Sequence, residues 1–380
     1  LTKSMRDKIA SSAMKITYGV CGRFHAFALA AQMEKLGVLE RVYCADKSWG
    51  APFGVPPSKF QNRWDIAIRQ RAARYIPTVR FNQRKIEAQF DEWLLRRVRC
   101  LRPGVLHGWN LHVRRTFQAL KGEGWKLCLE RSCPHNVFQD ELLKEEASRL
   151  GLHYHSDPRT LAEATEELYL ADIISAPSRY SAKSYSDPAL QAKLRVNPLG
   201  SNFAMRSPFS RPREPLRVLM VGNDFLRKGT HYLIEAFRLI KEPTARLKIR
   251  GNVPKKYESL ILDSRIQIIK AVTKSQLDGL YRWANVFCLP SIDEGFGLVT
   301  LEAMAYGLPL VVTDNVGSAD VLDPSVTRVV PIRDPHAIEE GIRWASLLEP
   351  DHIWHAASKV LEDNSWTISG NRQLRDVYLA

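Results

Sequence analysis

The sequence predicts an α/β fold of two Rossmann-like domains, each with a parallel sheet covered by helices, facing each other across a deep cleft. Short apolar runs alternate with longer amphipathic stretches along the chain, and a proline-rich polar segment, 207–215, separates two such series. Strand–helix–strand alternation is typical of parallel sheets. Because a single core rarely exceeds about 250–300 residues, a chain of 380 residues is expected to form two domains, 14–206 and 216–362.

Each half of the chain supplies six expected strands. Those of the first half are Lys15–Val20, Arg41–Cys44, Val105–Gly108, Lys126–Glu130, Asp172–Ala176 and Leu194–Asn197. Those of the second half are Arg217–Gly222, Arg246–Gly251, Ile266–Ile269, Val286–Pro290, Leu308–Thr313 and Thr327–Val330. Between many of them, apolar residues recur at three- and four-residue spacing, which predicts helices at Phe27–Leu36, Thr230–Ile240 and Lys274–Trp283.

The composition is that of an ordinary globular protein, with 45% hydrophobic and 25% charged residues. No apolar run reaches the about 18 residues that cross a membrane. The six cysteines form no CxxC pair, so we interpret them as buried free thiols and expect a cytoplasmic location. Residues Leu1–Ala13 lack the apolar stretch of a secretory signal, and Met14 is the more natural start.

The net charge of +14 is concentrated in segment 59–102, where twelve basic residues face four acidic ones and leave a net of +8. Such a segment suggests an anionic partner: a phospholipid surface, nucleic acid or an acidic acceptor. Apolar residues are interleaved with the arginines: Trp64, Ile66, Ile68, Tyr75, Phe81, Phe90, Trp93 and Leu94. This pattern suits an interfacial helix that binds the inner face of an anionic membrane. The alternative is a solvated charged face whose aromatic residues belong to the core.

The strongest motif is the segment 291–305, which directly follows the apolar strand 286–290. A glycine-bracketed loop leads into a helix that is expected to begin near Leu298. Glycines let the backbone approach a ligand closely, and a helix start offers free N–H groups to an anion. Glu294 and Glu302 are suited to accept hydrogen bonds from hydroxyls. A diphosphate between two polyols, as in a nucleotide sugar, fits this arrangement; an ordinary helix start with a solvated acid is the alternative.

The spacing of Glu294 and Glu302 around GFGLVTLEAMAYGLP closely resembles the paired-glutamate signature of retaining family 4 glycosyltransferases of GT-B fold. The resemblance implies that Glu294 contacts the donor sugar and that Glu302 contacts the ribose. It also implies that the loop backbone holds phosphate, at Gly295, Phe296, Gly297 and Leu298. The resemblance covers most of the chain and is specific from Arg217 to about Asp334.

A second motif follows the strand that ends at Gly222, where the turn carries Arg227 and Lys228 before a helix at Thr230. Adjacent cations suit phosphate oxygens and would stabilise a leaving diphosphate. The resembled family often has its arginine earlier in this loop, where Asn223 stands here. This arrangement is similar to a variant seen in some lipopolysaccharide-core glucosyltransferases. The alternative is a basic surface turn.

Further donor contacts are expected from Gly222 and Asn223, where one strand ends, and from Gly251 at the end of another. The backbone of Ala271 and Val272 would meet the base. A UDP-sugar is the favoured donor, although nothing here distinguishes uridine from guanosine or adenosine. For Gly251, a structural turn is the alternative.

The loops after the first-half strands are expected to line the acceptor side of the cleft. The resemblance implies sugar or acceptor contacts there from Gly22, Arg23, His25, Arg131 and His135, and a catalytic role for His107 beside Glu294, Lys228 and Arg227. The alternatives are a plain turn for the glycine-bearing loop and a structural role for each histidine.

These observations predict a hexosyltransferase that moves a hexose, with retention, from a nucleotide diphosphate sugar to a hydroxyl. The acceptor would be a glycan, lipid-linked or small molecule in cell-surface polysaccharide or glycolipid synthesis. No DxD-like motif is obvious, so we predict no metal and no cofactor. The resemblance implies that 216–362 binds the donor and that 14–206 binds the acceptor, completed by a helix at 363–380 with Trp366 and Tyr378 as anchors.

Three alternatives stay open. A sugar epimerase or a phosphorylase could share the two-domain shape, but neither predicts the paired-glutamate loop. A nucleic-acid-binding protein would rest on the charge alone, so no nucleic acid partner is expected. A dinucleotide dehydrogenase would require a GxGxxG motif with a downstream acid, which does not occur.

Overall fold

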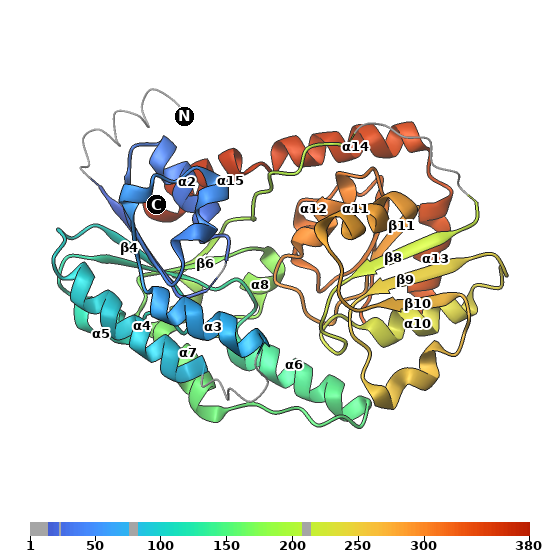
Figure 1. Ribbon diagram of the computed structural model, residues 1–380, viewed down its shortest axis with the longest axis horizontal. Coiled ribbons are helices and arrows are strands. Elements are labelled where there is room, and N and C mark those ends of the chain that lie inside the picture. The colour runs from blue at the N-terminus through green and yellow to red at the C-terminus, as the bar shows by residue number, and fades with distance from the viewer. Residues whose placement is uncertain (1–13, 23, 76–82, 207–213) are drawn as a thin grey trace.

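The computed structural model describes residues 14–22, 24–75, 83–206 and 214–380, and this part of the chain forms two parallel sheets (Figure 1). The first sheet has seven strands in the order β3-β2-β1-β4-β5-β6-β7. The second has six, in the order β10-β9-β8-β11-β12-β13. Every strand pair is parallel, and helices cover the sheets. The predicted fold class is confirmed.

All twelve expected strands are present, with ends within two residues of those predicted. The first sheet contains β1 (Ile16–Val20), β2 (Leu39–Cys44), β3 (Phe60–Asn62), β4 (Val105–Trp109), β5 (Lys126–Glu130), β6 (Ile173–Ala176) and β7 (Leu194–Val196). The second contains β8 (Arg217–Val221), β9 (Arg246–Arg250), β10 (Ile266–Ile269), β11 (Val286–Leu289), β12 (Leu310–Thr313) and β13 (Thr327–Val330). The edge strand β3 was not predicted, because three residues are too few to show an alternating pattern.

Helices lie between many of the strands, and further helices follow the last strand, β13. Those up to the linker are α2 (Ala26–Lys35), α3 (Trp64–Tyr75), α4 (Gln83–Val98), α5 (Arg114–Leu120), α6 (Asn136–Arg149), α7 (Pro158–Leu170), α8 (Arg179–Lys183) and α9 (Pro188–Gln191). Those after it are α10 (Thr230–Leu239), α11 (Lys274–Trp283), α12 (Leu298–Met304), α13 (Pro335–Ser346), α14 (Pro350–Asp363) and α15 (Trp366–Arg372). Short 3₁₀ segments are η1 (Lys47–Trp49), η2 (Ala51–Phe53), η3 (Pro57–Lys59), η4 (Lys255–Ile261) and η5 (Gly317–Asp320), and η6 (Gln373–Tyr378) is a π-helix. Within the described ranges, every helix is too short or too polar to cross a bilayer.

The C-terminal segment returns to the first sheet. Figure 1 shows α14 running from the second sheet toward the first, and α15 lying beside α2. The chain can pass closely there because Gly200 has no side chain: a Cβ at that position would lie 2.6 Å from Trp366 Cα. The fully buried Tyr378 then bonds its hydroxyl to His107 Nδ1 (2.5 Å) and the Tyr18 hydroxyl (3.0 Å). The tail therefore contributes packing and hydrogen bonds to the first core.

Replacing Tyr378 by Ala should lower the free energy of unfolding by about 3–5 kcal/mol, because it removes a buried aromatic ring. Tyr378→Phe keeps the ring and loses only the hydroxyl, which should cost about 1–3 kcal/mol. Urea unfolding followed by tryptophan fluorescence measures both changes. An alanine variant as stable as the parent would contradict this account of tail docking.

Candidate functional site

The turn between β11 and α12 presents unpaired backbone donors. Gly297 has a φ of 92°, a left-handed conformation that favours glycine, and α12 begins at the next residue, Leu298. In the described part of the chain, the N–H groups of Phe296, Gly297 and Leu298 donate no hydrogen bond. N–H groups at the start of a helix have no partner inside that helix. Three consecutive N–H groups are therefore available to an anion here.

Two cations face this turn from the neighbouring loop between β8 and α10. The Glu294 carboxylate accepts hydrogen bonds from the Lys228 ammonium and from Arg227 Nη1, the latter at 3.2 Å. The side chains of Lys228 and Glu294 are only 9% and 14% exposed, so their charges are largely removed from water. The structure thus brings together three of the four residues predicted to be catalytic.

Burial and the neighbouring Arg227 guanidinium lower the pKa of Lys228 to about 7, although Asp224 and Asp293 oppose this shift. Burial lowers it because the charged ammonium is poorly solvated there. An additional negative charge beside Lys228 would favour its protonated form. Lys228 and Arg227 together are therefore suited to bind a group with more than one negative charge, such as a diphosphate.

Glu302 lies one turn inside α12. Its Oε2 accepts a hydrogen bond from the Tyr281 hydroxyl at 3.0 Å, and burial raises the pKa of the carboxyl. The Tyr281 ring stacks on Tyr306, with centroids 5.0 Å apart. Glu302 is therefore held by an aromatic pair and is oriented before any ligand binds.

The other predicted donor residues lie at neighbouring strand ends. Gly251 is needed as a glycine, because a Cβ there would lie 2.1 Å from the Gly222 carbonyl oxygen. Asn223 Oδ1 accepts a hydrogen bond from the Arg250 guanidinium. Ala271 and Val272 follow β10, where Ala271 is exposed and Val272 is half-buried.

A cavity of about 530 Å³ borders the Asn223 loop. It is lined by 223–226 and 252–254 from the second domain and by Leu152 from the first. Among the residues predicted to bind the donor, Asn223 lines this cavity, which both domains border.

The first-domain candidates occupy different environments. Arg131 donates to the Pro134 carbonyl oxygen (2.9 Å), Asn110 Oδ1 (3.1 Å) and Gln139 Oε1 (3.2 Å), so its position is fixed. His135 caps α6 by accepting the Val137 N–H, at 3.3 Å.

The glycine-bearing loop after β1 is only partly covered by the structure. Gly22 lies against the Phe24 ring: a Cβ at position 22 would be 2.4 Å from a carbon atom of that ring. Arg23 lies outside the described residues.

His25 and His107 flank one buried carboxylate. His25 Nε2 lies 3.1 Å from Glu130 Oε1, and His107 Nε2 lies 3.3 Å from Glu130 Oε2. Burial alone would raise the pKa of Glu130, but the two imidazoles outweigh it and hold that pKa below its usual value. His107 is fully buried and bonds Tyr378 on its other side. The structure therefore places His107 in the core, and its catalytic role stays a prediction.

Sequence reasoning missed Glu130, and it predicted a phosphate contact for Gly295 but not a contact with the first domain. Glu130 ends the expected strand β5, and its position as the last strand residue was the available signal. Gly295 is more telling, because a Cβ there would lie 2.2 Å from the Ser132 carbonyl oxygen of the first domain. The Glu294 turn thus touches the carboxyl end of β5.

Residues 202–357 match the family described as Glycosyl transferases group 1. This part of the chain is a group 1 glycosyl transferase domain. The chain is 26% identical over 178 residues to a putative colanic acid biosynthesis glycosyltransferase of Escherichia coli K12, an alignment that spans 42% of this chain and 44% of that protein. The chain thus spans less than half the length of this relative.

Two solved structures share the fold of the whole chain. A sucrose-phosphate synthase from Thermosynechococcus elongatus superposes with a TM-score of 0.69 at 17% identity, covering 95% of this chain and 98% of that one. A UDP-forming trehalose-phosphate synthase from Burkholderia xenovorans gives a TM-score of 0.63 at 15% identity, covering 96% and 98%. The predicted GT-B architecture is confirmed at the level of the fold.

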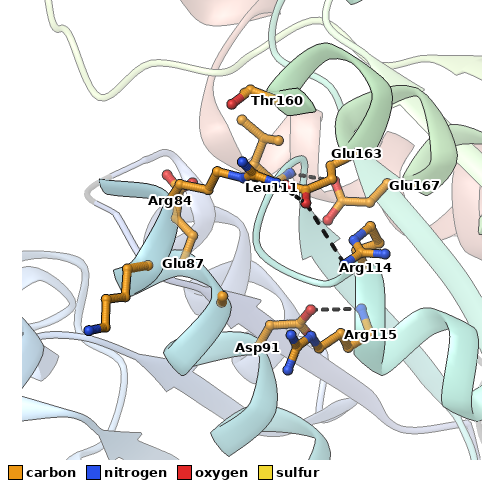
Figure 2. Close-up of a pocket in the computed structure, with 11 residues that line it drawn as sticks. Arg84, Glu87, Asp91, Leu111, Arg114, Arg115, Thr160, Glu163 and Glu167 are labelled. Atoms are coloured by element: carbon orange, nitrogen blue, oxygen red, sulfur yellow. Dashed lines mark hydrogen bonds and ion pairs between the residues drawn. The ribbon is translucent and has the colours of Figure 1, made fainter. Parts of the chain in front are cut away.

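A separate pocket of about 310 Å³ lies outside the group 1 domain. Figure 2 shows its lining residues, which come mainly from α4, α5 and α7. Its carboxylates already have partners: Asp91 accepts the Arg115 and Thr116 N–H groups, and Glu163 pairs with Arg84. Glu167 likewise accepts the N–H group of Val113 at 3.0 Å. We interpret this pocket as a set of contacts that join three helices.

Gly295→Ala should force the two domains apart, because the new Cβ would collide with a backbone oxygen that cannot rotate away. We expect the free energy of unfolding to fall by about 1–3 kcal/mol and the radius of gyration in small-angle scattering to rise. Gly279→Ala in α11 is the matched control, since a Cβ there meets nothing within 4 Å. A Gly295→Ala protein with unchanged stability and scattering would refute the close contact.

Proposed function

We propose that the chain is a retaining hexosyltransferase that uses a nucleotide diphosphate sugar, with a UDP-sugar favoured. The observation that carries this proposal is the turn at Glu294, where two cations bond one carboxylate and the next residues, 296–298, have N–H groups that donate no hydrogen bond within the described part of the chain. Lys228, Arg227 and the N–H groups of 296–298 would bind the diphosphate, and Glu294 would accept hydroxyls of the sugar. Glu302, already oriented by Tyr281, would accept ribose hydroxyls.

The acceptor is proposed to be a hydroxyl of a glycan, lipid-linked or small molecule in cell-surface polysaccharide or glycolipid synthesis. The E. coli relative, a putative colanic acid biosynthesis glycosyltransferase, supports a glycan as the acceptor. The Burkholderia neighbour, which is described as UDP-forming, supports the donor. Residues of the first domain, including Arg131 and His25, would contact the acceptor.

In the proposed reaction, the bond between the sugar anomeric carbon and the phosphate oxygen breaks as the acceptor oxygen attacks from the same face. The leaving phosphate takes the proton of the acceptor hydroxyl. Negative charge grows on the diphosphate in the transition state because the breaking bond leaves its electron pair on the phosphate oxygen, and Lys228 and Arg227 stabilise this charge. Binding of the diphosphate would also release Glu294 from these cations toward the sugar, because both anions compete for the same donors.

Glu294→Ala should lower the transfer rate at least about 100-fold, since it removes a group positioned on the reacting sugar. Donor consumption and product would be measured across a panel of nucleotide sugars, with and without acceptors. Glu340→Ala, an exposed position on α13, is the control for loss of a glutamate. Full activity of a folded Glu294→Ala protein would overturn the site, and an isomerised sugar without acceptor would indicate an epimerase.

We further propose that transfer needs no metal ion, because Lys228 and Arg227 would supply the positive charge that a metal otherwise provides. Incubation with excess EDTA should leave the rate of transfer unchanged. The assay must follow sugar transfer directly, so that a coupling enzyme's metal requirement does not interfere. A rate that falls with EDTA and returns with added Mg²⁺ or Mn²⁺ would contradict metal independence.

A second proposal concerns the partner of the basic segment 59–102. On α4, Phe90 and Leu94 are buried in the core, as the alternative interpretation of this segment holds. On α3, however, Trp64 and Ile68 stand one turn apart and are 67% and 54% exposed. We propose that this face of α3, within a segment of net charge +8, docks on an anionic membrane surface.

The protein should therefore sediment with vesicles containing phosphatidylserine more strongly than with neutral phosphatidylcholine vesicles, and high salt should weaken this binding. The double variant Trp64→Ser, Ile68→Ser should lose most of it. The control variant Leu262→Ser, Leu347→Ser removes two exposed apolar side chains elsewhere and should bind normally. Equal sedimentation with both kinds of vesicle would contradict the proposed binding to an anionic membrane surface.

A further inference from the structure

The residue directly before Glu294 is held by the opposite domain. Asp293 is fully buried, and its Oδ1 accepts a hydrogen bond from the Tyr180 hydroxyl of α8 at 2.8 Å. Its Oδ2 accepts one from Gln139 Nε2 of α6 at 2.5 Å. Among the residues that the structure describes, these two are the hydrogen-bond donors to this carboxylate, and both belong to the first domain.

The residue directly after Glu294 is held by the same part of the first domain. The Gly295 carbonyl oxygen accepts hydrogen bonds from Ser178 Oγ at 2.7 Å and from Ser181 Oγ at 3.3 Å. Both serines are buried at the start of α8. The first domain therefore holds the Asp293 side chain and the Gly295 carbonyl on either side of Glu294, while the amides of Asp293 and Glu294 bond the second domain and the Glu294 side chain faces its cations.

Gln139 links this contact to a residue expected to bind the acceptor. Gln139 Oε1 accepts a hydrogen bond from Arg131 Nη2 at 3.2 Å. A continuous chain of hydrogen bonds thus runs from Arg131, after β5, through Gln139 to Asp293. A change at the acceptor side can reach the neighbour of Glu294 through two side chains.

A buried carboxylate is costly unless its oxygens are hydrogen-bonded. In a protein whose domains had separated, the Asp293 carboxylate would lose its hydrogen bonds from Tyr180 and Gln139 together. Its oxygens would then need hydrogen bonds from water instead. Its turn would then relax, because the hydrogen bonds to Gly295 would break at the same time. The conformation of the Glu294 turn is therefore coupled to contact between the domains.

We propose that Tyr180 and Gln139 are positioning residues that hold Glu294 in its productive place only when the two domains touch. Cleavage of the donor would then depend on an engaged acceptor domain. This inference rests on the proposed transferase function. It adds that residues of the first domain control the catalytic turn of the second without touching the donor.

The experiment compares Tyr180→Phe with Tyr169→Phe. The control removes a similar tyrosine–aspartate hydrogen bond, from Tyr169 to Asp187, at an exposed position on α7. The first readout is hydrogen exchange of the ligand-free protein at the amides of Ile292, Asp293 and Glu294, which bond the carbonyls of Arg227 and Asn315. We expect Tyr180→Phe to speed this exchange about tenfold and Tyr169→Phe to leave it unchanged.

The second readout is steady-state transfer with the donor and acceptor found in the panel. Tyr180→Phe should lower kcat about tenfold while the donor KM changes by less than about threefold, because the turn is misplaced and the phosphate contacts persist. If Tyr180→Phe does not fold, Gln139→Ala replaces it with the same expectations. A merely structural role would lower stability and leave kcat of the folded enzyme unchanged.

The outcomes separate the two proposals. Unchanged exchange and unchanged kcat in a folded Tyr180→Phe protein would overturn the positioning role and leave the transferase assignment standing. Faster exchange in a protein whose parent transfers no sugar from any donor would overturn the transferase assignment, and with it the role in catalysis. Faster exchange together with a selective fall in kcat supports both.

Discussion

The buried contact of Glu294 with Lys228 and Arg227 is the interaction on which the rest of this structure depends. It exists because β8 and β11 are neighbours in a parallel sheet, so that their carboxyl ends meet although the loops are far apart in sequence. Each loop then leads into a helix, α10 or α12. Largely buried charges are stable only with partners, and here they partner one another. A diphosphate would offer the two cations a stronger alternative to the carboxylate.

The first domain completes this arrangement from the other side. Ser178 and Tyr180 bond the backbone and side chain beside Glu294. A second bridge is formed by Glu146 of α6, whose carboxylate accepts His231 Nε2 at 3.0 Å and Arg333 Nε at 2.7 Å from the second domain. Figure 1 shows α6 extending from the first domain beneath the second. The closed arrangement therefore rests on several buried polar contacts, and each would have to be resolvated when the domains separate.

Much of the second domain could be predicted from the sequence, because its determinants are local. Apolar strand runs, the helix start at Leu298 and the cations at 227–228 each lie within about ten consecutive residues. The partners of Asp293 and Glu146 could not be predicted, since they lie more than 80 residues away across the interface. The burial of His107 depends on Tyr378 at the opposite end of the chain, which no local pattern reveals.

The first domain was less predictable for a second reason. Segment 59–102 mixes arginine with aromatic residues along two helices, and such a pattern does not distinguish core from surface. In the structure α4 turns Phe90 inward, whereas α3 leaves Trp64 exposed. Only the packing of each helix on the sheet separates the two, because both have weak amphipathic periodicity.

The central claim is that a bound diphosphate displaces the Glu294 carboxylate from Lys228 and Arg227. A crystal structure of the protein with a UDP-hexose tests it most directly. The account predicts phosphate oxygens on both cations and on the N–H groups of 296–298, with Glu294 turned to the sugar. A donor bound elsewhere, or a bound donor with Glu294 still paired to Lys228, would contradict it.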